Sequence, residues 1–140
     1  MAAEYSFVPV QTVAEDENII FTDGDRACRK GFITHRSGSG VFRLKGTGCR
    51  ATYKVEFNAN IAVATGGTVG PISVALQEDG ETLGNAVAIV TPAAIGDFFN
   101  VSLSTFIYIP CNCCVTVSVQ NTSEQAIEVQ NANLIVVRTA

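Results

Sequence analysis

The chain has 140 residues, of which 47% are hydrophobic and 16% are charged, and its formal net charge is −4. This length and composition indicate one domain, residues 1–140, with a substantial core, and they exclude a disordered tail. No apolar run approaches the ~20 residues that span a bilayer, so neither a transmembrane helix nor a membrane partner is expected. The first residues include Glu4 and no basic segment, which is not the pattern of a secretory signal peptide.

The basic residues are concentrated in one stretch that contains no acidic residue and includes the single histidine, His35. This basic segment comprises Arg26, Arg29, Lys30, Arg36, Arg43, Lys45, Arg50 and Lys54. It could seat an anionic partner or the acidic edge of a neighbouring subunit, or it could simply be a solvated face. A nucleic-acid partner is not expected, because the whole chain is acidic and carries no recognition motif.

Two short apolar runs, residues 31–36 and 41–46, flank a Gly-rich turn and predict a β-hairpin. The hairpin centre lies between Gly38 and Ser39, so Cys28 and Cys49 are equidistant from it and would face each other in ideal antiparallel register. Cysteines facing each other across two strands can form a disulfide. Bulges at nearby glycines would shift the register, and the two cysteines would then be buried free thiols.

Period-two alternation dominates the rest of the chain. In residues 49–64, "CRATYKVEFNANIAVA", the side chains of Tyr53, Val55 and Phe57 share one face, which predicts a long, half-buried strand. Residues 71–77, 98–103 and 114–120 repeat the alternation, and residues 126–138 predict a closing strand with a break near Asn131. An Asp-Gly pair within residues 78–81 predicts a tight hairpin turn. About nine or ten short strands without helices indicate an all-β sandwich or barrel.

Residues 105–111, "TFIYIPC", are apolar on both faces of the expected strand. This pattern fits a strand between the core and a neighbouring subunit, and it also fits a central strand buried within a monomer. Four aromatic residues are therefore candidates for either the core or an oligomer interface: Tyr53, Phe57, Phe106 and Tyr108.

Cys111, Cys113 and Cys114 lie within four positions, directly before an alternating Val-Thr-Val run. A zinc site would need four ligands, usually in Cys-x-x-Cys pairs, and this spacing is not present. Redox catalysis typically uses Cys-x-x-Cys at the start of a helix, whereas this cluster opens a strand. Adjacent strand residues point to opposite faces, so we expect one thiol of the cluster in the core and another available for an inter-chain disulfide.

No catalytic, cofactor or metal site is predicted. A single histidine excludes a pair of catalytic histidines, and His35, beside the Gly-rich turn, is expected to be a surface residue rather than a general base. Residues 37–40 match neither a nucleophile elbow nor a phosphate-binding loop.

Four segments resemble the tumour necrosis factor and complement-head jelly rolls, in particular their bacterial and phage branch, which includes the C-terminal heads of exosporium glycoproteins. They are "VQTVAEDENIIF" (10–21), "CRATYKVEF" (49–57), "ISVALQEDGETLGNA" (72–86) and "NANLIVVRTA" (131–140). For the first segment, residues 10–21, the resemblance implies the opening strand of the family's jelly roll. Two positions depart from the family pattern: Ala51 replaces a glycine, and "IPCNCC" replaces an Ala-Gly-Asp turn. There is no collagen-like repeat, so a fibrous protein is not implied.

The resemblance implies an antiparallel jelly-roll sandwich of about ten strands. It implies assembly as a homotrimer, with the outer face of one sheet around the threefold axis, and it implies no catalysis and no cofactor. The expected role is that of a structural or adhesive part of a virion or of a bacterial cell or spore surface. Two alternatives remain: a subunit of a larger, disulfide-linked filament or shell, built by strand augmentation, or a lectin-like module that binds glycans. Partners other than a second copy would then be virion proteins, surface-layer proteins or glycans.

Overall fold

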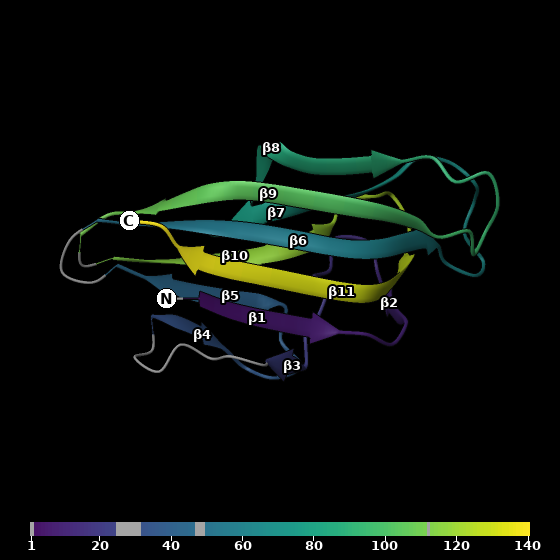
Figure 1. Cartoon of the computed structure of the whole chain (residues 1–140). Helices are drawn as coiled ribbons and strands as arrows, with labels where there is room; N and C mark the ends of the chain where they lie inside the picture. Colours follow the sequence, from purple (N-terminus) through teal and green to yellow (C-terminus); the bar gives the residue numbers. More distant parts are fainter. Residues whose placement is uncertain (1, 25–31, 47–49, 112) are drawn as a thin grey trace.

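A computed structural model of the chain describes residues 2–24, 32–46, 50–111 and 113–140, and these residues form eleven strands and no helix. The strands build two antiparallel sheets that pack face to face (Figure 1). Sheet 1 has the order β3 (Asp23–Gly24), β1 (Ala2–Phe7), β11 (Ile127–Arg138), β6 (Ala51–Val63), β9 (Phe99–Ile109), and β2 (Gln11–Val13) also pairs with β11. Sheet 2 has the order β4 (Ile33–His35), β5 (Val41–Lys45), β10 (Cys114–Asn121), β7 (Ile72–Glu78), β8 (Glu81–Val90). This arrangement confirms the predicted all-β jelly-roll sandwich.

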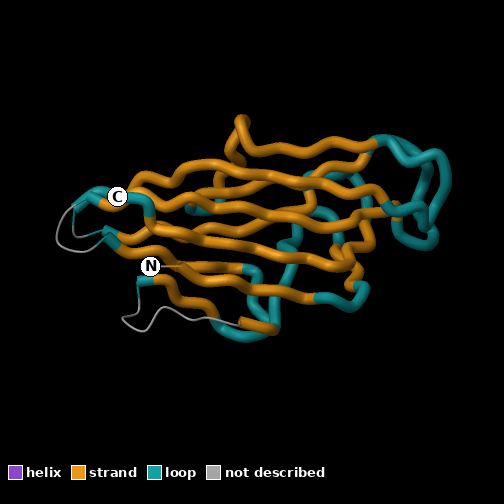
Figure 2. The backbone as a smooth tube through the Cα atoms, in the orientation of Figure 1, coloured by secondary structure: helices purple, strands orange, loops and turns teal. Residues whose placement is uncertain are grey.

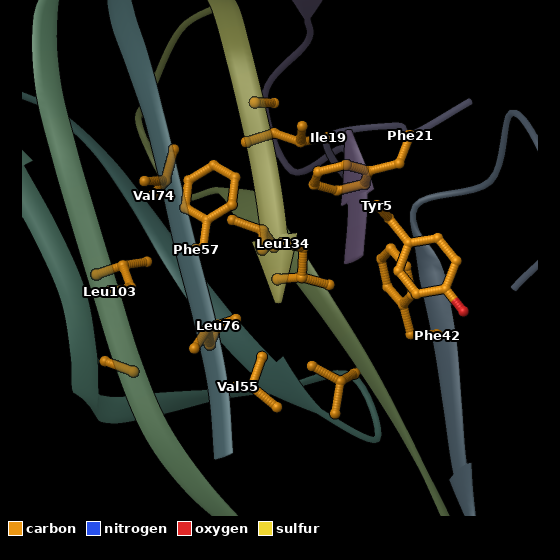
Figure 3. Packing of buried hydrophobic residues seen from close by; sticks show 14 of the residues in the cluster. Tyr5, Ile19, Phe21, Phe42, Val55, Phe57, Val74, Leu76, Leu103 and Leu134 are labelled. Carbon is orange, nitrogen blue, oxygen red and sulfur yellow. The ribbon is translucent and has the colours of Figure 1, made fainter. Parts of the chain in front are cut away.

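The core fills the space between the two sheets. The alternating strands turn their apolar positions inward, as in β6, where Tyr53, Val55 and Phe57 are all buried. Phe21 packs edge-on against Phe42 and Phe57, with ring centroids 5.3 Å and 6.3 Å apart (Figure 3). Each such fully buried side chain stabilises the fold by ~1.5–3 kcal/mol relative to an exposed one.

The predicted turns are present. Asp79 and Gly80 connect β7 to β8 with φ angles of 51° and 85°, the positive values that a two-residue turn between twisted strands requires. The predicted break near Asn131 is a bulge in β11, where the pairing with β6 shifts between Gln130 and Asn133. Asn131 itself has a φ of 55°, a conformation that asparagine adopts more readily than most residues.

The N-terminal part differs from the expectation. Residues 10–21 do not form one opening strand: β2 covers only Gln11–Val13, and the chain then crosses to sheet 2, where the Ile19 amide donates to the Val119 carbonyl. Ile19 and Phe21 are nevertheless fully buried, so the apolar residues of this segment indicate a contribution to the core and not a strand. The opening strand is β1, which the alternation pattern does not indicate because only Ala3 and Tyr5 mark its inward face.

The sandwich has two distinct ends. At the cysteine end, β5 and β9 end and β6 and β10 begin. At the opposite loop end, the connections cluster (Figure 2): they comprise residues 14–18, 64–71, 91–98 and 122–126. Both termini of the described chain lie toward the cysteine end (Figure 1).

Candidate interaction surfaces

The four candidate aromatic residues divide between the core and the surface. Tyr53 and Phe57 point inward from β6 and are 0% and 1% exposed, so they belong to the core. Phe106 and Tyr108 point outward from β9 and are 49% and 70% exposed. Because β9 is the edge strand of sheet 1, the alternative of a central strand buried within a monomer is wrong.

The outer face of sheet 1 has an apolar part toward the cysteine end. Phe106 faces Lys54 across the β9–β6 ladder, and Lys54 faces Val137 across the β6–β11 ladder. In the next row, Ile135 of β11 lies opposite Glu56. Lys54 and Glu56 form an ion pair of 2.9 Å that is largely exposed, which contributes little to stability.

Toward the loop end, the same face carries amide side chains. Asn100 Nδ2 donates hydrogen bonds to Asn58 Oδ1 at 2.7 Å and to Asn60 Oδ1 at 3.2 Å. Asn60 Nδ2 donates in turn to Asn131 Oδ1 at 3.1 Å. A hollow of about 310 Å³ lies between the apolar and the amide parts, lined in part by Asn58 and Ile135. The outer face of sheet 1 is therefore apolar at one end and a connected amide network at the other.

The cysteine cluster is not in the core. Cys111 and Cys113 are exposed and Cys114 is half-buried, so the expectation that one of these thiols fills the core is wrong. The reason is register: the inward positions of β10 begin at Val115, and Cys114 therefore points to the outer face of sheet 2. There, Arg43 Nη2 donates a 3.0 Å hydrogen bond to Cys114 Sγ.

The two cysteine pairings stay predictions. All three thiols of the cluster are free, and the exposure of Cys111 and Cys113 is compatible with an inter-chain disulfide. The proposed partners Cys28 and Cys49 lie outside the described residues.

The basic segment does not form one surface. Arg43 and Lys45 lie two residues apart on the outer face of sheet 2, whereas Lys54 lies on the outer face of sheet 1. Arg36 is exposed in the β4–β5 turn, and Arg50 is exposed at the cysteine end. Three further members, Arg26, Arg29 and Lys30, lie outside the described residues.

His35 is a packing residue and not a freely exposed one. It is half-buried, its ring stacks on Phe42 with centroids 4.3 Å apart, and it also contacts Tyr5 at 4.8 Å. Its Nε2 lies 2.7 Å from the carbonyl oxygen of Ser39, which closes the β4–β5 turn. The expectation of a surface histidine is thus only partly right, because the aromatic cluster beneath β4 was not visible in the sequence.

Two further observations concern metals and membranes. In the part of the chain that the structure describes, no three His, Cys, Asp or Glu side chains are grouped so that they could hold a metal ion. The same residues include no helix with the length and hydropathy needed to cross a membrane.

Solved structures of tumour necrosis factor-like and complement proteins share this fold. Eiger TNF from S. frugiperda superposes with a TM-score of 0.71 at 13% identity, covering 100% of this chain and 92% of that chain. Murine APRIL superposes with a TM-score of 0.69 at 11% identity, covering 99% of this chain and 100% of that chain. The globular domain of zebrafish complement 1qA superposes with a TM-score of 0.60 at 11% identity, covering 97% of this chain and 94% of that chain. No protein-family model and no curated protein matches the sequence. The chain therefore has a TNF/C1q-like jelly-roll fold.

Proposed function

We propose that the chain is a non-catalytic structural subunit that assembles as a homotrimer through the outer face of sheet 1. The observation that carries this proposal is the exposure of Phe106 and Tyr108, two large aromatic side chains on the same face of an edge strand. Burying apolar surface is favourable by roughly 25 cal/mol per Å², and aromatic side chains are enriched at protein interfaces. A second copy packed against this face would remove both rings from water.

A second pair of exposed apolar residues supports assembly into a closed ring of subunits. Val87 and Ile89 of β8 are exposed on the outer face of sheet 2, and β8 runs beside β9 along one edge of the sandwich (Figure 1). Two unlike apolar patches on one molecule favour a contact between unlike surfaces, and such contacts close into rings when the rotation fits. The number three comes from the sequence resemblance to jelly-roll heads.

Changing both exposed aromatics to threonine (Phe106→Thr with Tyr108→Thr) tests this interface, because threonine keeps the strand propensity. The matched control is Val41→Thr, at a half-exposed position on the outer face of sheet 2. Light scattering after size exclusion should give a monomer for the double variant and an unchanged trimer for the control. A double variant that keeps the trimer, with an intact circular dichroism spectrum, would show that the interface lies elsewhere.

Carbohydrate binding is a second candidate, favoured by a groove at the cysteine end. This groove has a volume of about 430 Å³ and is lined in part by Arg50, Thr52 and Tyr108. An exposed aromatic ring beside polar side chains suits a sugar. On a glycan array, binding by the wild-type protein that is lost in Tyr108→Ala would support this function. Binding of the wild-type protein to no glycan would contradict it.

The setting that we infer is the exterior of a particle. The four sequence segments that resemble bacterial and phage jelly rolls support a decoration or fibre-head protein of a virion, or a component of a bacterial cell or spore surface. Neighbouring capsid or tail genes would favour the virion, and neighbouring spore-coat genes would favour the spore.

A further inference from the structure

The two ends of the sandwich carry charges of opposite sign. The four segments that form the loop end, residues 14–18, 64–71, 91–98 and 122–126, contain no Lys or Arg. The acidic residues of the loop end are Glu15, Asp16, Glu17, Asp97, Glu124 and Glu128. The basic residues described at or next to the cysteine end are Arg43, Lys45, Arg50 and Arg138.

Three of the four basic charges at the cysteine end are available to a partner. Among the described residues, Arg43, Lys45 and Arg50 have no carboxylate within 4.0 Å. Arg43 and Arg50 are exposed and Lys45 is half-buried. The β7–β8 turn also carries acidic residues; its Asp79 Oδ1 accepts hydrogen bonds from the amide and the hydroxyl of Thr116, the residue that faces Arg43 across the β10–β5 ladder.

The acidic charges at the loop end are held on an ordered turn. The Glu17 amide donates to the Ala14 carbonyl at 3.1 Å, and the Asp16 amide donates to the Asn121 carbonyl at 3.1 Å. The Asn121 amide donates back to the Glu17 carbonyl at 2.9 Å. The backbone that presents these carboxylates is thus anchored to the end of β10, and a partner would not have to order it on binding.

We propose that the loop end of one copy docks on the cysteine end of a second copy, so that copies stack head to tail. One chain supplies both complementary surfaces, which makes a second copy the partner that the charges fit. A contact between opposite ends of the same molecule does not close on itself, and it therefore builds a linear stack. The stack leaves the outer face of sheet 1 free, so it is compatible with the proposed trimer but does not depend on it.

The test uses two charge-reversal variants of the full chain. In the first, Glu15→Lys, Glu17→Lys, Asp97→Lys and Glu124→Lys make both ends basic; in the second, Arg43→Glu, Lys45→Glu and Arg50→Glu make both ends acidic. Six of these seven positions are exposed and Lys45 is half-buried, which keeps the cost to folding small. Sedimentation velocity is measured at about 10 mM ionic strength, where charges act over ~30 Å, and at about 1 M, where they act over ~3 Å.

The wild-type protein should show at least a twofold (~2×) higher apparent mass at low salt than at high salt, increasing with protein concentration. Each variant alone should stay at its high-salt mass, and an equimolar mixture should stack again, because each acidic end then meets a basic end of the other variant.

Three results would overturn the proposal. They are a wild-type mass that does not depend on salt, variants that still stack alone, and a mixture that fails to stack. Retention of unstacked wild-type protein on heparin would instead assign the basic end to a polyanion. The high-salt mass reports the trimer separately, so failure of the stack and failure of the trimer can be distinguished.

Discussion

The hydroxyl of Tyr53, in β6 of sheet 1, donates a 2.7 Å hydrogen bond to the carbonyl of Lys45, in β5 of sheet 2. The Tyr53 ring is fully buried, so this bond connects the two sheets within the core at the cysteine end. Tyr53, a candidate for either the core or an interface from its sequence pattern, is thus a core residue that links the two sheets.

Removing this hydroxyl should destabilise the fold. Tyr53→Phe leaves the Lys45 carbonyl without this donor, which should lower the free energy of unfolding by ~1–2 kcal/mol in urea denaturation. Tyr108→Phe makes the same chemical change on an exposed ring and should change stability by less than ~0.5 kcal/mol at equal protein concentration. Equal effects of the two substitutions would contradict the role assigned to Tyr53.

A substitution at Gly80, in the turn between β7 and β8, should lower stability through the backbone conformation and not through steric clashes. Gly80 has a φ of 85°, and a Cβ added there would meet no atom within 4 Å. Gly80→Ala should therefore cost ~1–2 kcal/mol from the left-handed backbone alone. Gly84→Ala is the control, because this glycine is also in open space but is not in a left-handed conformation. That variant should be neutral or slightly stabilising in guanidinium denaturation; a loss equal to that of Gly80→Ala would refute the backbone explanation.

The stability of the loop end should depend on one buried side-chain amide, that of Asn121. Asn121 Nδ2 donates to the carbonyls of Val13, Ala14 and Gln125, and its Oδ1 accepts from the Ser123 amide. Asn121→Ala leaves these buried groups unpaired and should cost about 3 kcal/mol, which lowers the melting temperature by roughly 10 °C.

The matched control for Asn121→Ala is Asn100→Ala, because Asn100 also donates several amide hydrogen bonds but is exposed. It should lower the melting temperature by less than ~3 °C in differential scanning calorimetry. A melting temperature of Asn121→Ala within that same range would show that the buried network is not needed.

Glu78 should make stability depend on pH. Burial, together with the neighbouring carboxylate of Asp79, raises the pKa of Glu78 above its ordinary value of 4.5. The folded protein therefore holds this proton more tightly than the unfolded chain, so the stability it contributes is present below pH 4.5 and is lost as the pH rises through the folded pKa.

Replacing Glu78 by glutamine should remove this dependence, so the stability of Glu78→Gln relative to the wild type should increase from pH 4 toward neutrality. Urea denaturation at a series of pH values measures it. A difference between the two proteins that stays constant with pH would contradict the raised pKa.

Much of the fold could be predicted because its local patterns are strong. The alternation in residues 49–64 became β6, the Asp-Gly pair became the β7–β8 turn, and the break near Asn131 became a bulge. These features depend on neighbouring residues along the chain. The strand β1 is short and has only two inward side chains, so its pairing with β11 depends on contacts that alternation cannot indicate.

The candidate surfaces were only partly predictable for the same reason. The pattern of residues 105–111 identified an apolar strand, but only the sheet order shows that Phe106 and Tyr108 face outward at an edge. For Cys114, the inward and outward faces of β10 depend on its register with β5. The opposite charges of the two ends arise from residues that are far apart in the sequence and meet only in the folded chain.

The solution mass of the wild-type protein tests the central claim most directly. Sedimentation equilibrium in about 1 M salt suppresses end-to-end attraction and preserves apolar contacts. The proposed assembly predicts three times the protomer mass of 14.8 kDa, with and without reductant. A mass of one protomer across the micromolar range would contradict it.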